Sequence, residues 1–205
     1  MVKTPPGPGS IRCSAGALQY GSCEQSGREL SDSALPTASR ALEIALAGGG
    51  IGGITAALCL ARAGHAVTVF EQADAFIESG AGVQISPNAS RVLHALGLEE
   101  SLRSVGVLPE ATEIRSWRNG RVISRTPLGL TAQQRYGAPY YHVHRGDLLQ
   151  LLVKEASGLA NVELVSGRRV STFKQDSTGV SLDLGDEARV FDVLIGADGI
   201  HSAVR

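Results

Sequence analysis

The chain has 205 residues, which is enough for one domain with a tail or for two small domains. Hydrophobic residues make up 43% of the chain, a fraction that supports a buried core, and the net charge is −1. A nearly neutral chain without a pronounced basic patch gives no indication of a nucleic-acid partner or of an anionic membrane surface.

Residues 1–40 are rich in proline, glycine and serine and show no sustained hydrophobic period, so we expect a disordered tail followed by one domain over 41–205. A mitochondrial transit peptide is an alternative because arginine and serine are frequent, but Glu24, Glu29 and Asp32 count against it. The three cysteines form no C-x-x-C pair and no secretory signal is visible. These features predict a reducing, cytoplasmic location.

The next stretch predicts a strand, a glycine turn, a helix and a second strand. Glu43–Ala47 is a short apolar run typical of a buried parallel strand. Ile54–Ala63 has small and apolar residues at helical spacing, and Gly64 stands where a helix-ending glycine belongs. Ala66–Phe70 is apolar and rich in β-branched residues, which predicts a second strand.

Gly48, Gly50 and Gly53 between these elements satisfy the pattern G-x-G-x-x-G. The first glycine permits a sharp turn, the second lets a pyrophosphate approach the backbone, and the third lets the helix pack closely. Glu71 follows Gly48 by 23 positions, close to the ~20 expected for a carboxylate that binds a ribose. Because this carboxylate would repel a 2′-phosphate, the unit favours FAD or NAD over NADP.

A membrane span is the competing interpretation of the same stretch, because residues 44–61 contain no charge over 18 positions. Five glycines within 48–53 would make a poor helix, at about 1 kcal/mol each relative to alanine. We therefore favour the dinucleotide-binding interpretation and expect no membrane span.

The rest of the chain alternates short strands and helices. A hairpin is predicted around Asn119-Gly120, and 125–139 is expected to be irregular. The other expected elements are strands at 83–85, 140–144, 161–165 and 190–195, helices at 86–96, 98–105 and 148–156, a hairpin at 169–184, and a helix beginning near 201. This pattern predicts an α/β fold, Rossmann-like, with a parallel sheet, helices and added β-hairpins.

Four motifs in order carry a family resemblance: GGGIGG with its downstream FE, GAGVQISPNASR at 80–91, HRGDLLQLL at 144–152 and GADGIHSAVR at 196–205. Together they resemble the FAD-dependent aromatic hydroxylases of the salicylate hydroxylase and para-hydroxybenzoate hydroxylase type, over 42–205. The resemblance implies an FAD/NAD(P)-binding domain and flavin-borne hydroxylation of a small aromatic substrate with NAD(P)H and O₂.

The resemblance also implies roles for individual residues. Gly48, Gly50 and Gly53 would hold the pyrophosphate, and Glu71 the adenosine ribose. The further cofactor-binding residues implied are Ala81, Gly82 and Gln84 along the ribityl or flavin side, Arg145 on the FAD, and Asp198 with Gly199 serving both FAD and the pyridine nucleotide.

Simpler interpretations of several of these residues stay open. Arg145 is also compatible with a surface charge at a helix start, and Asp198-Gly199 with an ordinary turn. His142 and His144 share a strand face, but no third ligand with suitable spacing accompanies them, so no metal site is expected.

Members of the resembled family are about twice as long, and no Gly-Asp-Ala-x-His segment occurs here. The chain is therefore expected to be truncated relative to the family, with an incomplete aromatic pocket and poor solubility. Three hypotheses follow: the FAD-binding part of a hydroxylase, a non-catalytic FAD- or dinucleotide-binding fragment, or an NAD-dependent dehydrogenase. The last is disfavoured because no downstream acid/base pair is visible. The oligomeric state, the substrate and the choice of NADH or NADPH are not indicated.

Overall fold

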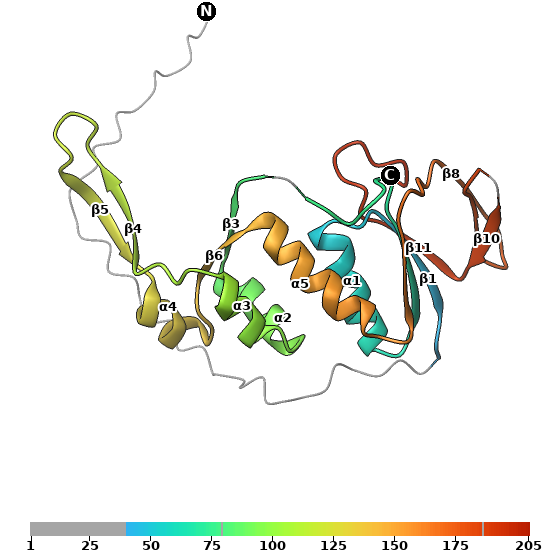
Figure 1. Ribbon diagram of the computed structural model, residues 1–205, viewed down its shortest axis with the longest axis horizontal. Coiled ribbons are helices and arrows are strands. Elements are labelled where there is room, and N and C mark those ends of the chain that lie inside the picture. Colours follow the sequence, from blue (N-terminus) through green and yellow to red (C-terminus); the bar gives the residue numbers. More distant parts are fainter. Residues whose placement is uncertain (1–39, 79, 186) are drawn as a thin grey trace, which may run out of the picture. The chain divides into compact units, whose positions relative to one another are not determined.

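The computed structural model describes residues 40–78, 80–185 and 187–205 (Figure 1). The expected disordered tail thus lies outside the described residues except for its last position, and the boundary at residue 41 stays a prediction. The helices are α1 (Ile51–Arg62), α2 (Pro87–Ala95), α3 (Glu99–Val105), α4 (Gly129–Tyr136) and α5 (Arg145–Ser157). The strands are β1 (Glu43–Ala47), β2 (Ala66–Phe70), β3 (Gly82–Ile85), β4 (Ala111–Arg115), β5 (Val122–Pro127), β6 (Tyr141–His144), β7 (Val162–Val165), β8 (Thr172–Gln175), β9 (Val180–Asp183), β10 (Ala188–Phe191) and β11 (Val193–Gly196).

The centre of the fold is a four-stranded parallel sheet in the order β11-β1-β2-β7. Ala47 at the end of β1 stands opposite Phe70 of β2 and Gly196 of β11. Helices α1 and α5 pack side by side against this sheet (Figure 1). The predicted α/β class with a parallel sheet is confirmed. Among the described residues, no helix is long and apolar enough to cross a membrane.

The first strand–helix–strand unit forms for local reasons. Leu46 of β1 is buried in one core with the α1 face of Ile54, Ala57, Leu58 and Ala61. Ala45 and Ala47 are buried in a second core on the other side of the sheet. Gly64 adopts φ +97°, and its N–H donates to Ala61 O while the N–H of the next residue donates to Leu60 O. These two bonds end the helix as predicted. Helix α1 begins at Ile51, three residues earlier than expected, with two glycines in its first turn.

The expectation of one strand over 190–195 is wrong. Strand β10 belongs to an antiparallel sheet with β9 and β8, whereas β11 joins the parallel sheet. The chain changes sheets at Asp192, whose N–H donates to Glu43 O at 2.8 Å and whose Oδ2 accepts the Glu43 N–H at 2.8 Å. The sequence pattern does not separate the two strands, because the apolar run continues on both sides of Asp192.

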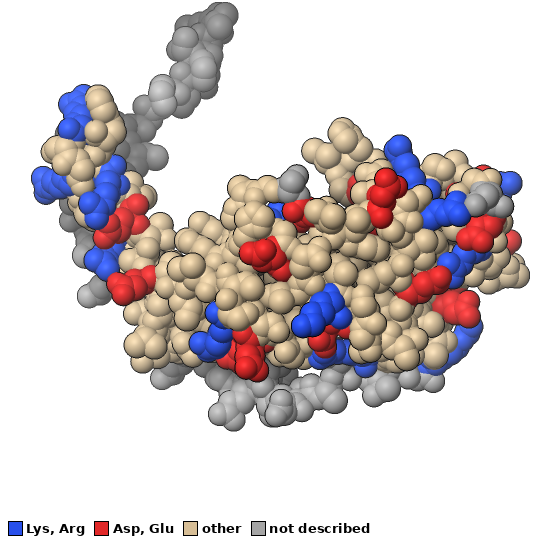
Figure 2. All heavy atoms as spheres, viewed as in Figure 1, with Lys and Arg blue, Asp and Glu red and all other residues tan. Residues whose placement is uncertain are grey.

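The expectation that 125–139 is irregular is also wrong, since β5 continues to Pro127 and α4 follows. Helix α4 gives a weak periodic signal because Ala132 is its one buried residue. The predicted β4–β5 hairpin is confirmed, but with a longer loop than the two-residue turn, closed by Ser116 N–H donating to Arg121 O. Figure 2 shows basic side chains gathered over this hairpin.

The antiparallel sheet is fastened to the parallel sheet by Arg189 of β10. Its guanidinium Nη2 lies 2.7 Å from Glu163 Oε2, and the same carboxylate oxygen accepts the Thr68 hydroxyl at 3.0 Å. The guanidinium carbon also lies 5.6 and 5.3 Å from the ring centroids of Phe70 and Phe191. One side chain therefore joins β10 to strands β2 and β7.

We expect Arg189→Ala to lower the free energy of unfolding by about 1 to 2 kcal/mol, through loss of an ion pair and two cation–π contacts. Arg91→Ala on α2, where the side chain is exposed, is the matched control and should change stability little. Urea unfolding of both variants measures the effect. Equal urea midpoints for Arg189→Ala and Arg91→Ala would contradict a stabilising role of Arg189 between the two sheets.

On the helical side of the core, His94 of α2 lies between two polar groups. Its Nε2 is 3.3 Å from the hydroxyl of the fully buried Tyr141, and its Nδ1 is 3.5 Å from Glu99 Oε2. Arg103 pairs with the same glutamate at 2.9 Å. Burial lowers the pKa of His94 below its ordinary 6.5, although Glu99 acts in the opposite direction. The fold therefore favours the neutral imidazole.

A pH dependence of stability follows from this lowered pKa. Above 6.5, the ordinary pKa of histidine, both states hold a neutral His94. As the pH falls, the unfolded chain takes up the proton first, and the stability contributed by His94 is lost as the pH passes through the lower folded pKa. We expect His94→Gln to remove this part of the acid dependence in urea titrations at several pH values. His201→Gln, at an exposed position, should keep it.

Candidate cofactor site

The carboxyl ends of the central parallel strands bring three of the predicted residues together. Gly48 follows β1, Glu71 follows β2, and Asp198 follows β11 by two residues. The Ala197 N–H donates to Ala47 O at 2.7 Å, and the Gly48 N–H donates to Phe70 O at 2.8 Å. Because all these strands are parallel, their ends meet at one edge, where ligands of open α/β sheets bind.

The turn after β1 requires glycine at two positions. Gly48 has φ +104°, and a Cβ there would lie 2.4 Å from the carbonyl oxygen of Ala197. A Cβ on Gly53 would lie 1.9 Å from Gly48 O and 3.4 Å from the Ala197 Cβ. The glycine corner, as we name residues 48–53, is therefore packed tightly against the segment that leads to Asp198.

The outer side of the glycine corner is open to a ligand. Gly50 is the N-cap of α1 with extended backbone, and a Cβ built there meets no atom within 4 Å. No described side chain caps this helix end, and its first turn carries no acidic residue. Free N–H groups and the positive end of the helix dipole suit a phosphate group at this point.

The carboxylate of Glu71 points into the glycine corner. Its Oε2 accepts the Gly49 N–H at 2.8 Å, and its Oε1 accepts the Ala73 N–H at 2.9 Å. An ionised carboxylate has about four acceptor positions, so it keeps capacity for two hydroxyl donors. The side chain is half-buried. A ribose diol has the donors that this oriented acceptor can bind.

Two residues beside the glycine corner, Phe76 and Gln150, were not predicted from the sequence. A Cβ on Gly49 would lie 2.4 Å from the ring of Phe76, which covers the corner from the loop after β2. That loop is tied to α5 by Gln150, whose Nε2 donates to Phe76 O at 2.7 Å. The one sequence signal for Phe76 is a pair of large apolar residues, Phe76 and Ile77, within the otherwise polar and small-residue segment QADAFIES.

Asp198 and Gly199 lie at the same edge, but the helix expected from residue 201 is absent from the described residues 199–205. Instead, Asp198 Oδ2 accepts the Ala203 N–H at 2.7 Å, which turns the chain back. Burial raises the pKa of Asp198, but hydrogen bonds from Ser202 and the Ala203 N–H outweigh it, so the pKa lies below its ordinary value. Its Oδ1 is buried without a hydrogen-bond partner among the described residues.

A second group of predicted residues gathers around β3 and β6. Gly82 and Gln84 lie on β3, antiparallel to β6, and Arg145 begins α5 directly after β6. The Arg145 N–H donates to Ala81 O at 3.4 Å. Ala81, Gly82 and Gln84 are exposed. The structure thus brings four predicted residues together: Ala81, Gly82, Gln84 and Arg145.

The guanidinium of Arg145 forms an ion pair with Glu78, which the sequence did not predict. The hydrogen bond to Glu78 and its negative charge raise the pKa of Arg145 above the ordinary value. The second oxygen of Glu78, Oε2, is buried and has no partner within the described part of the chain. The pair fixes the arginine at the N-terminus of α5, with its side chain about half exposed.

No metal-binding cluster of His, Cys, Asp or Glu occurs in the described ranges. His142 stacks edge-on against Tyr140, and His144 Nδ1 lies 4.0 Å from Asp147 Oδ1. Both histidines belong to β6 and share one face, as predicted.

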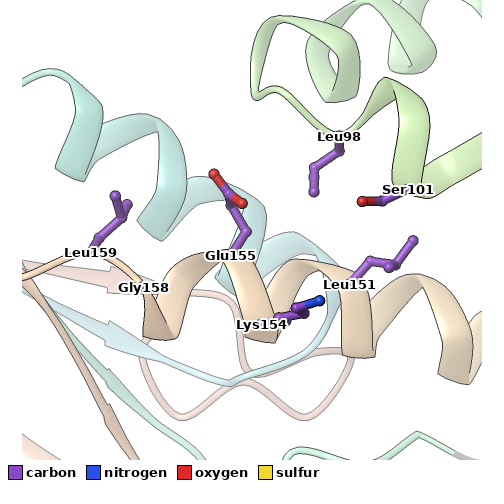
Figure 3. A pocket seen from close by; sticks show the side chains of 7 residues that line it. All are labelled: Leu98, Ser101, Leu151, Lys154, Glu155, Gly158 and Leu159. Carbon is purple, nitrogen blue, oxygen red and sulfur yellow. The ribbon is translucent and has the colours of Figure 1, made fainter.

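Two hollows on the surface are separate from these residues. Figure 3 shows one of about 310 Å³ between α3 and α5, lined by Leu98, Ser101, Leu151, Lys154, Glu155, Gly158 and Leu159. The other, of about 270 Å³, lies around Arg189 and Glu163. Neither is lined by a predicted cofactor residue.

The glycine corner and the Glu71 carboxylate lie together at the carboxyl ends of the parallel strands. This arrangement is typical of a dinucleotide-binding protein.

Comparison with known proteins narrows this class to one family. Residues 41–205 match the family described as "FAD binding domain", and the chain belongs to this family.

The relatives in this family act on aromatic compounds. The chain is 44% identical over 167 residues to 3-amino-4-hydroxybenzoate 2-monooxygenase of Streptomyces cremeus, covering 81% of this chain and 42% of the relative. It is 39% identical over 165 residues to 3-hydroxybenzoate 6-hydroxylase of Polaromonas naphthalenivorans, with 80% and 41% covered. Among solved structures, HpxO of Klebsiella pneumoniae complexed with FAD is similar at a TM-score of 0.69 and 27% identity, with 80% of this chain and 41% of that chain covered.

The match is confined to part of each relative. The chain spans about two fifths of the length of the curated relatives it matches, and this part is the FAD-binding part. The predicted resemblance to FAD-dependent aromatic monooxygenases is therefore confirmed, as is FAD as the cofactor of the family.

Proposed function

We propose that the chain binds FAD and forms the FAD-binding part of a flavin-dependent monooxygenase that hydroxylates a small aromatic substrate with NAD(P)H and O₂. The observation that carries the proposal is the position of Glu71. Its carboxylate accepts the Gly49 N–H at 2.8 Å and so stands beside the open N-terminus of α1. An acceptor for ribose hydroxyls and donors for a pyrophosphate lie at one edge of the sheet.

Each predicted residue has a place in this proposal. The glycine corner holds the pyrophosphate through backbone N–H groups, and Glu71 holds the adenosine ribose. Toward the ribityl and flavin side we assign Ala81, Gly82, Gln84 and Arg145. We assign Asp198 and Gly199 to both FAD and the pyridine nucleotide. The residues fit the group, because the corner is open at Gly50 and the Glu71 carboxylate has free acceptor capacity.

Bound FAD supplies the redox chemistry, accepting reducing equivalents from a pyridine nucleotide and delivering them to O₂. The chain's own residues bind and orient it. The ion pair with Glu78 holds the guanidinium of Arg145, whose backbone N–H donates to Ala81 O. Asp198 stays ionised at neutral pH because its pKa is lowered, so it is an acceptor and not a proton donor there.

The substrate class is inferred from the relatives. The two compared above act on 3-amino-4-hydroxybenzoate and 3-hydroxybenzoate, by their names. We propose a ring carrying a carboxylate and an activating hydroxyl or amino group. We also propose a cytoplasmic location, which agrees with the location expected from the cysteine pattern.

A second candidate is an FAD-binding chain without turnover of its own. It is favoured by one observation, that the matched part covers about two fifths of the relatives' length. An NAD-dependent dehydrogenase is the weaker third candidate, because the family match is to an FAD-binding domain.

The test is a titration of the purified chain with FAD, followed by flavin absorbance and fluorescence. We expect a saturable, yellow complex. NADH and NADPH consumption by that complex, with and without 3-hydroxybenzoate, then separates the monooxygenase from the non-catalytic module. A chain that takes up NAD but no FAD would overturn the proposal in favour of the dehydrogenase.

A further inference from the structure

The two-stranded sheet of β3 and β6 has one buried and one polar face. Its register pairs Ile85 with Tyr141 and Gln84 with His142. Ile85 and Tyr141 are buried, at 6% and 0% exposure, whereas Gln84 is exposed. Tyr140, directly before β6, contacts the side chains of both Gln84 and His142 and so lies on the same face. This polar face continues from the exposed backbone of residues 81 and 82.

On this face, the hydroxyl of Tyr140 donates to Gln84 Oε1 at 2.9 Å. A glutamine side chain has one acceptor oxygen and an NH₂ group with two donors. With its oxygen accepting the tyrosine hydroxyl, the amide has its NH₂ group on the opposite side. The NH₂ group of Gln84 is then presented outward as a pair of donors.

The ring of Tyr140 packs against His142. It meets the ring of His142 edge-on, with centroids 5.7 Å apart and planes at 73°. The backbone of His142 is fixed on its other side, since its N–H donates to Val107 O and the Val107 N–H donates to His142 O, both at 2.8 Å. The Tyr140 ring therefore packs against a residue whose backbone is held by hydrogen bonds on both sides.

We propose that Tyr140 is a positioning residue for FAD, which orients the Gln84 amide so that its NH₂ group donates to the flavin–ribityl half of the cofactor. This half offers acceptors, namely ribityl oxygens, ring carbonyls and ring nitrogens, so a fixed donor pair suits it. The inference rests on the proposed function, because Gln84 is assigned there to the FAD. The acceptor at Glu71 and the donor at Gln84 then recognise the two ends of one ligand.

The test compares two ligands, FAD and ADP, because ADP contains the adenosine and pyrophosphate but neither ribityl nor flavin. We expect Tyr140→Phe to weaken FAD binding about threefold to tenfold, the effect of one hydrogen bond. ADP affinity should not change. Tyr136→Phe is the matched control, because that exposed ring on α4 stacks on Arg135 and keeps this contact as phenylalanine.

A double-mutant cycle shows whether Tyr140 acts through Gln84. In Gln84→Leu, where no amide is left to orient, adding Tyr140→Phe should cause no further loss of FAD affinity. A further loss in that background, or a parallel loss of ADP affinity, would overturn the positioning role. Equal FAD affinity of Tyr140→Phe and the parent would overturn it and leave the proposed function standing. A parent that binds no FAD would overturn both.

Discussion

Replacing Gly53 by alanine is expected to destabilise the fold and abolish FAD binding. The added Cβ would lie 1.9 Å from Gly48 O, an oxygen of the backbone that cannot move aside as a flexible side chain does. Either α1 moves away from the corner or the corner opens, and both change the edge where the strand ends meet. We expect a loss of about 3 kcal/mol or more in the free energy of unfolding.

The neighbouring Gly52 offers a matched control for stability. A Cβ built on Gly52 meets no atom within 4 Å, and this glycine lies in the same first turn of α1. Because alanine is a better helix former than glycine, Gly52→Ala should raise stability by up to about 1 kcal/mol. Urea unfolding of the two variants therefore shifts in opposite directions. A Gly53→Ala chain as stable as the parent would show that the corner tolerates a side chain.

The contrast between Gly52 and Gly53 shows what a motif predicts and what it does not. The pattern G-x-G-x-x-G correctly marks Gly48 and Gly53 as positions with no room for a side chain. Their strand–helix–strand context is local in sequence, so hydrophobic period and turn residues predict it. The start of α1 at Ile51 was missed because glycine is a weak helix former, and here tertiary packing outweighs that weakness.

Elements whose signals are not local were predicted less well. The break at Asp192 depends on its bonds to Glu43, which is 149 positions away in the chain. Helix α4 buries one residue, Ala132, so its sequence carries little periodicity. The C-terminal turn depends on the Asp198 side chain accepting a backbone N–H five residues on, a bond that the helix signal does not contain.

Some residues of the candidate site were predicted from local spacing, and others were not. Gly48, Gly53 and Glu71 follow from spacing alone, whereas the family resemblance was needed for Gln84 and Arg145. Their partners, Tyr140 for Gln84 and Glu78 for Arg145, come from other segments and have no motif of their own. The contact of Tyr140 with Gln84 becomes visible when the register of β3 and β6 is known.

The most specific test of the cofactor site is Glu71→Ala, which we expect to weaken FAD binding by about a hundredfold or more. Its carboxylate is assigned two ribose hydroxyls, and hydrogen bonds to charged groups contribute about 1.5 to 3 kcal/mol each. The substitution also removes the acceptor of the Gly49 and Ala73 N–H groups. A general weakening of binding therefore does not by itself establish a ribose contact.

Two nucleotides that differ by one hydroxyl separate the ribose contact from this structural effect. The parent should bind ADP about tenfold more tightly than 2′-deoxy-ADP, because the deoxy sugar lacks one donor for the carboxylate. In Glu71→Ala the two nucleotides should bind equally, whatever the common affinity. Glu100→Ala, at an exposed position on α3, should keep the parent's preference. If Glu71→Ala also prefers ADP over 2′-deoxy-ADP, the 2′-hydroxyl binds to another group. The carboxylate then serves only to hold the glycine corner.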